Sequence, residues 1–240
     1  MGDPGRRLRA WAVHLFTASG VAFDLLAASL LWAPRPDVRL VFFLLVVPVV
    51  IDAADGPLAR RFDVKRWAGA VDGRTLDDIV DYVTFTFVPL LLVWRMGWVP
   101  RPGWAFVLPA LLASLFGFAN REAKQEKDGF FRGFPSYWNV YAFYAGLWAE
   151  RFGPLAPGIL CLALAVLTVA PVRFLYPNLA PSPWRLPLVG GALAWTAVVL
   201  AMLPSYPKTA PWLVLLSLTY PAFYVVLSLV LDARGRRRPA

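Results

Sequence analysis

Residues 52–81 read DAADGPLARRFDVKRWAGAVDGRTLDDIVD and lie between two strongly apolar stretches of the chain. Seven of the chain's 15 acidic residues fall within these thirty positions. Hydrophobic residues make up 59% of the sequence, and charged side chains are costly at or inside a membrane. The aspartate cluster therefore needs a physical reason, and the apolar stretches on either side of it indicate what kind of fold surrounds it.

The composition is that of a membrane protein. The chain has 240 residues, a mean hydropathy of +0.57 and 16% charged residues, whereas a soluble domain carries about 25% charged residues. The pattern predicts an all-α integral membrane protein, a polytopic bundle of about eight transmembrane helices in one domain over residues 1–240. The apolar segments lie near 10–33, 38–53, 77–99, 104–119, 136–150, 155–176, 185–204 and 211–231.

The basic residues predict the orientation of this bundle. With the N-terminus in the cytoplasm, 18 of the 24 Lys and Arg residues fall on the cytoplasmic side and six on the outer side. This bias favours cytoplasmic N- and C-termini and places the aspartate cluster at the cytoplasmic face. Basic loops facing anionic lipid headgroups explain the net charge of +9. We expect no nucleic-acid partner, because no soluble domain presents the charge.

The spacing of the aspartates points to metal binding. Asp52 and Asp55 are three residues apart, which places them about 60° apart on one helical face. Asp77 and Asp81 are four residues apart, about 40° apart on a second helix. Two helices that each present a carboxylate pair can converge on hard divalent cations such as Mg²⁺ or Mn²⁺. Such a site suits phosphoryl-type transfer.

The alternative is that the aspartates cap a helix and pair with neighbouring Arg and Lys side chains. We favour this alternative for Asp63 and Asp78, and Asp72 remains open. For the four spaced aspartates it is weaker, because acidic pairs at i,i+3 and i,i+4 repel unless something positive lies between them.

The fixed positions also resemble a known signature. The pattern Asp52-x2-Asp55-Gly56-x2-Ala59-Arg60, followed by Gly73-x3-Asp77-x3-Asp81, resembles that of the CDP-alcohol phosphotransferase family of integral membrane enzymes. The spacer of twelve residues, 61–72, is longer than the eight usual in the family. This spacer, the segment VHLFTASG and the segment GFPSYWN resemble those of bacterial phosphatidylcholine synthases.

The resemblance implies a reaction and a set of roles. The donor would be CDP-diacylglycerol, the acceptor choline, and the products phosphatidylcholine and CMP. The cofactor would be two divalent ions, Mn²⁺ or Mg²⁺. It also implies membrane lipids as partners, a homodimer and a bacterial inner-membrane location. Asp52, Asp55, Asp77 and Asp81 match metal ligands, with Asp81 also the catalytic base. The positions that match nucleotide-binding residues are Asp55, Gly56, Ala59, Arg60, Gly73, Thr17 and His14.

Two residues of the first apolar segment keep alternative interpretations. His14 stands where other family members often have Asn, and either contacts the nucleotide or packs against a neighbouring helix. Asp24 lies deeper in the segment. An intramembrane carboxylate is a functional candidate, and a hydrogen bond to a neighbouring span explains it equally well.

Choline recognition requires aromatic faces, because a trimethylammonium group donates no ordinary hydrogen bond. Tyr137, Trp138 and Tyr141 are candidates for such a cage, and Asn139 and Glu122 for polar contacts. The alternative is that these aromatic residues mark the membrane interface.

Two other functions compete with this interpretation. The first is the same chemistry with serine, glycerol 3-phosphate or inositol phosphate as acceptor. The second is a transporter or a noncatalytic scaffold. Transporters often contain repeated halves with binding sites near the membrane midplane, whereas this sequence shows no internal repeat and clusters its ionisable residues at one face.

Overall fold

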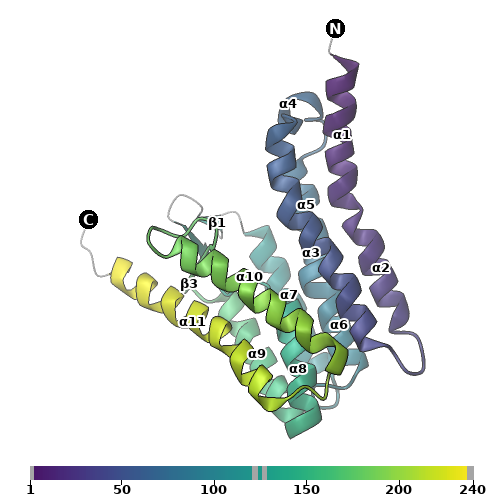
Figure 1. The fold of residues 1–240 in the computed structure, drawn as a ribbon, viewed down its shortest axis with the longest axis vertical. Helices are drawn as coiled ribbons and strands as arrows, with labels where there is room; N and C mark the ends of the chain where they lie inside the picture. The colour runs from purple at the N-terminus through teal and green to yellow at the C-terminus, as the bar shows by residue number, and fades with distance from the viewer. Residues whose placement is uncertain (1–2, 121–123, 126–128, 237–240) are drawn as a thin grey trace. The chain divides into compact units, whose positions relative to one another are not determined.

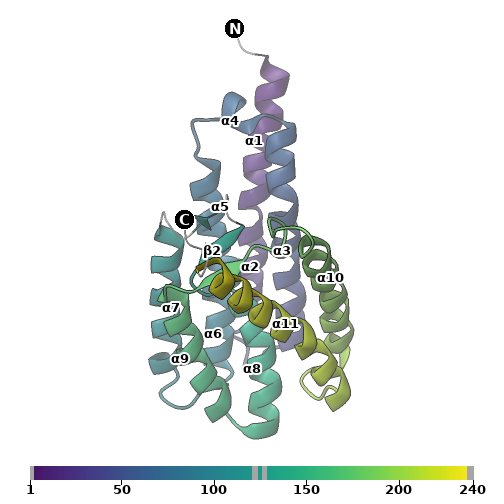
Figure 2. The ribbon, with the colours of Figure 1, turned by 90° about the vertical axis from the view of Figure 1, so that its left-hand side faces the viewer.

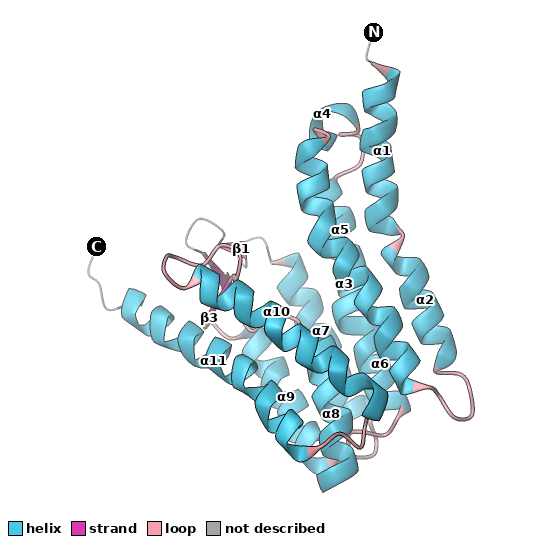
Figure 3. Cartoon of the chain, in the orientation of Figure 1, coloured by secondary structure: helices cyan, strands magenta, loops and turns pink. Residues whose placement is uncertain are grey.

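The computed structural model describes residues 3–120, 124–125 and 129–236, and most of this part of the chain is helical (Figure 3). The chain forms two compact units. The first comprises residues 1–96 and 137–143, and the second comprises residues 97–136 and 144–240.

The first unit carries the aspartate motif. The first span, made of α1 and α2, contacts α3 and the continuous stretch from α5 to α6 (Figure 1). It therefore touches both helical stretches that carry the two halves of the motif. The elements are α1 (Pro4–Ala18), α2 (Gly20–Leu30), α3 (Val38–Arg61), α4 (Val64–Trp67), α5 (Gly73–Asp81), the π-helical turn η1 (Tyr82–Phe87) and α6 (Val88–Arg95).

Aspartates begin three helices of this unit. The Asp3 carboxylate accepts hydrogen bonds from the backbone N–H groups of the first turn of α1, and Asp37 does the same for α3. Asp72 caps α5 in the same way. Each cap satisfies backbone donors that lack a partner within the helix.

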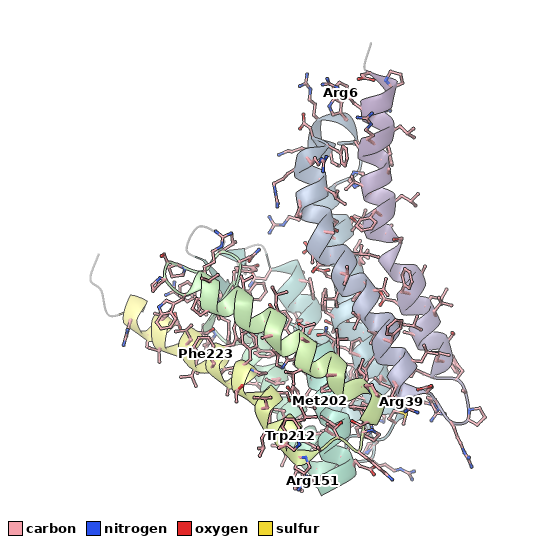
Figure 4. The ribbon with its side chains drawn as sticks, viewed as in Figure 1. Arg6, Arg39, Arg151, Met202, Trp212 and Phe223 are labelled. Atoms are coloured by element: carbon pink, nitrogen blue, oxygen red, sulfur yellow. The ribbon has the colours of Figure 1, made fainter. Side chains whose placement is uncertain are left out.

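Helix α3 is longer than the apolar segment predicted at 38–53. Its 24 residues run through the first half of the motif to Arg61, a length of about 36 Å. Arg6 and Arg39 lie toward opposite ends of the first unit (Figure 4).

The second unit packs further apolar helices around a small sheet. Helix α7 runs beside α9 (Figure 2), and α10 packs on α11. The unit contains α7 (Trp104–Ala119), most of α8 (Trp138–Phe152), α9 (Leu155–Val169), α10 (Arg185–Met202) and α11 (Pro211–Arg236). Its strands are β1 (Lys124–Gln125), β2 (Phe130–Arg132) and β3 (Arg173–Leu175), in the antiparallel order β1-β2-β3. These strands were not predicted, because two or three residues are too few for a periodic pattern.

Helix α11 holds this sheet. Phe174 and Leu175 of β3 are buried with Leu188 and Tyr224 in one apolar cluster. The Tyr224 hydroxyl donates to the Leu175 carbonyl at 2.9 Å. The adjacent Arg173 pairs with Asp232, with 2.6 Å between Nε and Oδ1. Apolar packing and a partly buried ion pair therefore hold the sheet on α11.

Three helical stretches of the described chain are long and apolar enough to cross a membrane. They are Pro4–Leu30, Arg185–Ser205 and Pro211–Arg234. Helices α7 and α9 are shorter and also apolar. The chain is therefore a helical membrane protein.

Candidate metal centre and substrate site

Three of the four spaced aspartates meet in the first unit. Asp52 and Asp55 come from α3 and Asp77 comes from α5, and one carboxylate oxygen from each lies within 4.8 Å of the others. Negative charges at this separation repel one another, and a cation among them reverses the sign of the interaction. Oxygen ligands are those that hard divalent cations prefer. The three-carboxylate cluster could therefore hold a divalent metal ion.

Thr17 of α1 holds one member of this cluster. Its hydroxyl donates to Oδ2 of Asp55 at 2.8 Å, and the two residues are only 7% and 8% exposed. The contact fixes the orientation of a carboxylate that reaches the cluster from a different helix. Thr17 was predicted as a nucleotide-binding residue, and this bond to Asp55 was missed. The two residues are 38 positions apart, so no local pattern signals the contact.

Asp81 lies one helical turn beyond Asp77, at the end of α5. It is half-buried and is not a member of the three-carboxylate cluster. Its assignments as a further metal ligand and as a proton acceptor remain predictions. Asp78, the other acidic residue of this helix, is also half-buried.

Asp72 has a structural role that the sequence left open. Its Oδ1 accepts from the Arg74 N–H at 3.2 Å and its Oδ2 from the Thr75 hydroxyl at 2.8 Å. These hydrogen bonds, above all that from Thr75, lower the pKa of Asp72. The carboxylate thus caps α5. Asp63 adopts the left-handed backbone conformation, at φ 50°, immediately before α4, a conformation that Asp tolerates better than most residues.

His14 packs against the spacer between the two halves of the motif. In the tautomer with a proton on Nε2, that nitrogen donates to the Ala68 carbonyl at 3.3 Å. A Cβ at Gly73 would approach Cε1 of His14, the ring carbon next to Nε2, to 3.2 Å, which is a tight contact. The imidazole thus holds residues 68–73 against α1. Packing against a neighbouring segment, one of the two interpretations of His14, accounts for this geometry.

Three predicted nucleotide-binding residues continue α3 beyond Asp55. Arg60 is exposed, and its Nη1 lies 3.5 Å from the point where a Cβ of Gly56 would stand. The guanidinium therefore covers the face of Gly56, one turn earlier in the helix. Ala59 packs instead against the apolar cluster that contains Val13 and Val64. The geometry places an exposed cation and a residue without a side chain next to the carboxylates.

Four of the five predicted choline residues, all at positions 137–141, also belong to the first unit. Trp138 is fully buried and Tyr141 is 4% exposed, and their rings meet edge to face with centroids 5.5 Å apart. Tyr137 is 36% exposed. Asn139 accepts a hydrogen bond from the Val140 N–H through its side-chain oxygen. Glu122 lies outside the described residues.

The segment that carries these aromatic residues packs on the helix that carries Asp52 and Asp55. Phe143 meets Phe42 of α3 edge to face, with ring centroids 5.6 Å apart. The start of α8 and the motif helix α3 therefore belong to one packed structure.

Comparison with known proteins agrees with the site. No family model matches the chain. The chain is 36% identical to the phosphatidylcholine synthase of Pseudomonas aeruginosa over 177 aligned residues. This alignment covers 72% of this chain and 71% of that protein. It is 40% identical to the phosphatidylcholine synthase of Bradyrhizobium diazoefficiens over 175 residues, which make up 72% of this chain and 64% of that protein. It is 32% identical over 229 residues to that of Legionella pneumophila, covering 91% and 87%. The chain therefore belongs to the phosphatidylcholine synthase family.

Proposed function

We propose that the protein transfers the phosphatidyl group of CDP-diacylglycerol to choline and releases CMP. The observation that carries this proposal is the meeting of Asp52, Asp55 and Asp77 in a chain of this family. The meeting of two motif halves separated by a basic spacer supports catalysis over a transporter or scaffold role.

The donor set of the cluster fits a divalent metal. Three carboxylates within 4.8 Å of one another supply hard oxygen ligands and negative charge, which suit Mg²⁺ and Mn²⁺ equally. Asp52, Asp55 and Asp77 would hold the metal, and Asp81, one turn further on, would approach a second ion. When bound, the metal neutralises charge on the pyrophosphate oxygens.

The residues of the chain supply the remaining steps. Asp81 accepts the proton of the choline hydroxyl. The choline oxygen then forms a bond to the phosphorus that carries diacylglycerol, and the bond from that phosphorus to the oxygen of CMP breaks. Because Gly56 has no side chain, the Arg60 guanidinium lies close to α3 beside the carboxylates, and there it contacts the phosphate oxygens of the nucleotide.

We place the choline trimethylammonium at the start of α8. The buried edge-to-face pair Trp138 and Tyr141, beside the more exposed Tyr137, supports an aromatic subsite. Asn139 would contribute a polar contact. Carboxylates of the same unit would add the negative charge that such a cation needs.

The proposal includes a topology. Eight spans with both termini in the cytoplasm would place the motif at the cytoplasmic face. There the site has access to the cytosol, where CMP and its precursors are dissolved. The apolar helices and the bacterial relatives support a location in the bacterial inner membrane. We further propose that the whole chain acts as one catalytic domain and as a homodimer.

The test is CMP release by the purified protein in detergent with CDP-diacylglycerol and Mn²⁺. Choline, serine, glycerol 3-phosphate and inositol phosphate are offered separately, and Asp81→Asn is compared with the neighbouring Asp78→Asn. We expect release with choline alone, lost in Asp81→Asn and retained in Asp78→Asn. Release with another acceptor would refute the choline assignment. No release with any acceptor from folded protein would refute the enzymatic proposal.

A further inference from the structure

The first span contains a carboxylate that the proposed reaction does not use. Asp24 of α2 is 1% exposed, and its Oδ2 accepts a hydrogen bond from the Thr84 hydroxyl at 2.7 Å. Its Oδ1 is buried and has no hydrogen-bond partner among the described residues. A buried carboxylate is costly inside a membrane, and an apolar side chain would pack there at lower cost. The bond to Thr84 therefore needs an explanation beyond packing.

Asp24 belongs to a strip of residues that contacts both halves of the motif. Thr17, Gly20 and Asp24 are spaced i, i+3 and i+7, which places them on one face of the first span. Thr17 bonds to Asp55 of α3, and Asp24 bonds to Thr84 directly after α5.

Gly20, between these two contacts, lies where three helices pack closely together. A Cβ at Gly20 would come within 3.2 Å of Val80 and 3.3 Å of Pro48, so α2, α3 and α5 meet tightly here. One face of the first span thus touches both metal-binding helices.

Thr84 lies in the turn that determines how α5 is rotated relative to α6. It is part of the π-helical turn η1, which joins α5 to α6. A π-helical turn contains one residue more than the α-helical turn that it replaces, so its loss would rotate α5 against α6 by about 100°. Asp77, Asp81 and Thr84 are spaced i, i+4 and i+7, so a rotation of the stretch at Thr84 moves the two aspartates with it.

The far end of this stretch is already fixed to the first span. Arg95, at the end of α6, donates from Nε to the Leu31 carbonyl at 2.8 Å and from Nη2 to the Ala33 carbonyl at 2.9 Å. The bond between Asp24 and Thr84 adds a second fixed point within the π-helical turn, three residues beyond Asp81. This second fixed point acts together with the tight packing of Val80 against Gly20 to set the rotation of the α5 face.

From this geometry we propose that Asp24 is a positioning residue for the metal site: its hydrogen bond with Thr84 holds the π-helical turn and thereby aims Asp77 and Asp81 toward Asp52 and Asp55. The proposal rests on the proposed function only in taking the carboxylate cluster as a divalent-metal site. Asp24 itself contacts neither metal nor substrate in this scheme.

The test measures Mn²⁺ binding to purified protein in detergent from the loss of the free-ion EPR signal, with Asp77→Asn as the site-deficient background. We expect Asp24→Ala and Thr84→Val to weaken Mn²⁺ binding about tenfold, the range found for residues that orient metal ligands. Asp24→Asn and Thr84→Ser keep an acceptor and a donor, and should bind Mn²⁺ as the unsubstituted protein does. In the double variant Asp24→Ala/Thr84→Val the loss should not exceed that of either single variant.

Thr86→Val is the matched control. Thr86 lies in the same turn and is fully buried, and its hydroxyl has no partner among the described residues. Its substitution should leave Mn²⁺ binding unchanged. Thr84→Val preserves side-chain volume, and elution volume and thermal unfolding show whether each variant is folded.

Three results would overturn the positioning role. They are unchanged Mn²⁺ binding in folded Thr84→Val, an equal loss in Thr86→Val, or an Asp24→Asn variant as weak as Asp24→Ala. CMP release with choline is recorded in parallel. If the Mn²⁺ pattern holds while the unsubstituted protein releases no CMP, the proposed function fails and the positioning of the metal site stands.

Discussion

The two units bury their carboxylates in different ways. In the first unit, Asp55 and Asp24 accept hydrogen bonds from the uncharged hydroxyls of Thr17 and Thr84. In the second unit, the equally buried Asp232 pairs with the guanidinium of Arg173, which also lies over the Phe130 ring at 5.0 Å. Arg173 neutralises the charge of Asp232, whereas a threonine hydroxyl orients a carboxylate and leaves its charge in place.

This difference separates Asp232, a structural carboxylate, from Asp55, which is suited to bind a cation; Asp24 shares the hydroxyl contact but lies outside the three-carboxylate cluster. A carboxylate paired with arginine gains little from a metal ion, because its charge is already balanced. A carboxylate that is oriented but still negative, and that lies close to two others, gains a great deal. Substitutions in the two units should therefore affect different properties of the protein.

The largest expected effect is that of Asp55→Asn. Loss of a charged ligand from the cluster removes several kcal/mol of electrostatic stabilisation, so CMP release should fall about a thousandfold. Mn²⁺ titration of the choline-dependent rate measures the loss. Asp232→Asn serves as the control from the other unit and should keep the Mn²⁺ dependence unchanged. An Mn²⁺ dependence that changes equally in both variants would contradict the comparison.

Asp232→Asn should instead destabilise the fold. It leaves Arg173 without its charged partner in a partly buried position, at a cost of about 3 kcal/mol. Thermal unfolding in detergent should show a clear decrease in the melting temperature, and Asp55→Asn should show little or none. A stable Asp232→Asn variant would mean that the ion pair contributes no net stability.

Thr17→Val should have a smaller effect on function. The variant keeps the side-chain volume and removes the hydroxyl that orients Asp55, so Mn²⁺ affinity should fall about tenfold. Thr17→Ser retains a hydroxyl and should restore most of the affinity. If Thr17→Ser is as weak as Thr17→Val, packing rather than the hydrogen bond is responsible.

The smallest expected effect concerns the cap of α5. Because hydrogen bonds lower the pKa of Asp72 below its ordinary value of 3.8, the ionised cap stabilises the fold above that pH. This contribution is lost as the pH falls through the lowered pKa. Asp72→Ala should therefore melt slightly below the unsubstituted protein at neutral pH, with a difference that disappears in strong acid. Melting curves across this range test the prediction, and a difference that does not depend on pH would contradict it.

The sequence alone determined the membrane class, the position of the motif and the carboxylates that share a helical face. The apolar segments and the spacing of Asp52, Asp55, Asp77 and Asp81 suffice for this, because long apolar runs indicate membrane helices and the helical repeat fixes angles within one helix. The predicted apolar segments likewise overlap the helices, including the exact bounds of α7. Chemistry could thus be inferred before any contact between helices was known.

Only the tertiary structure decided which carboxylates meet and what orients them. Asp52, Asp55 and Asp77 form the cluster while Asp81 lies one turn away from Asp77, and Thr17 and Asp24 bond to residues 38 and 60 positions distant. The π-helical turn and the short strands are likewise absent from the apolar pattern. The physical reason is that the rotation of one helix against another is set by packing between them, as at Gly20 against Pro48 and Val80.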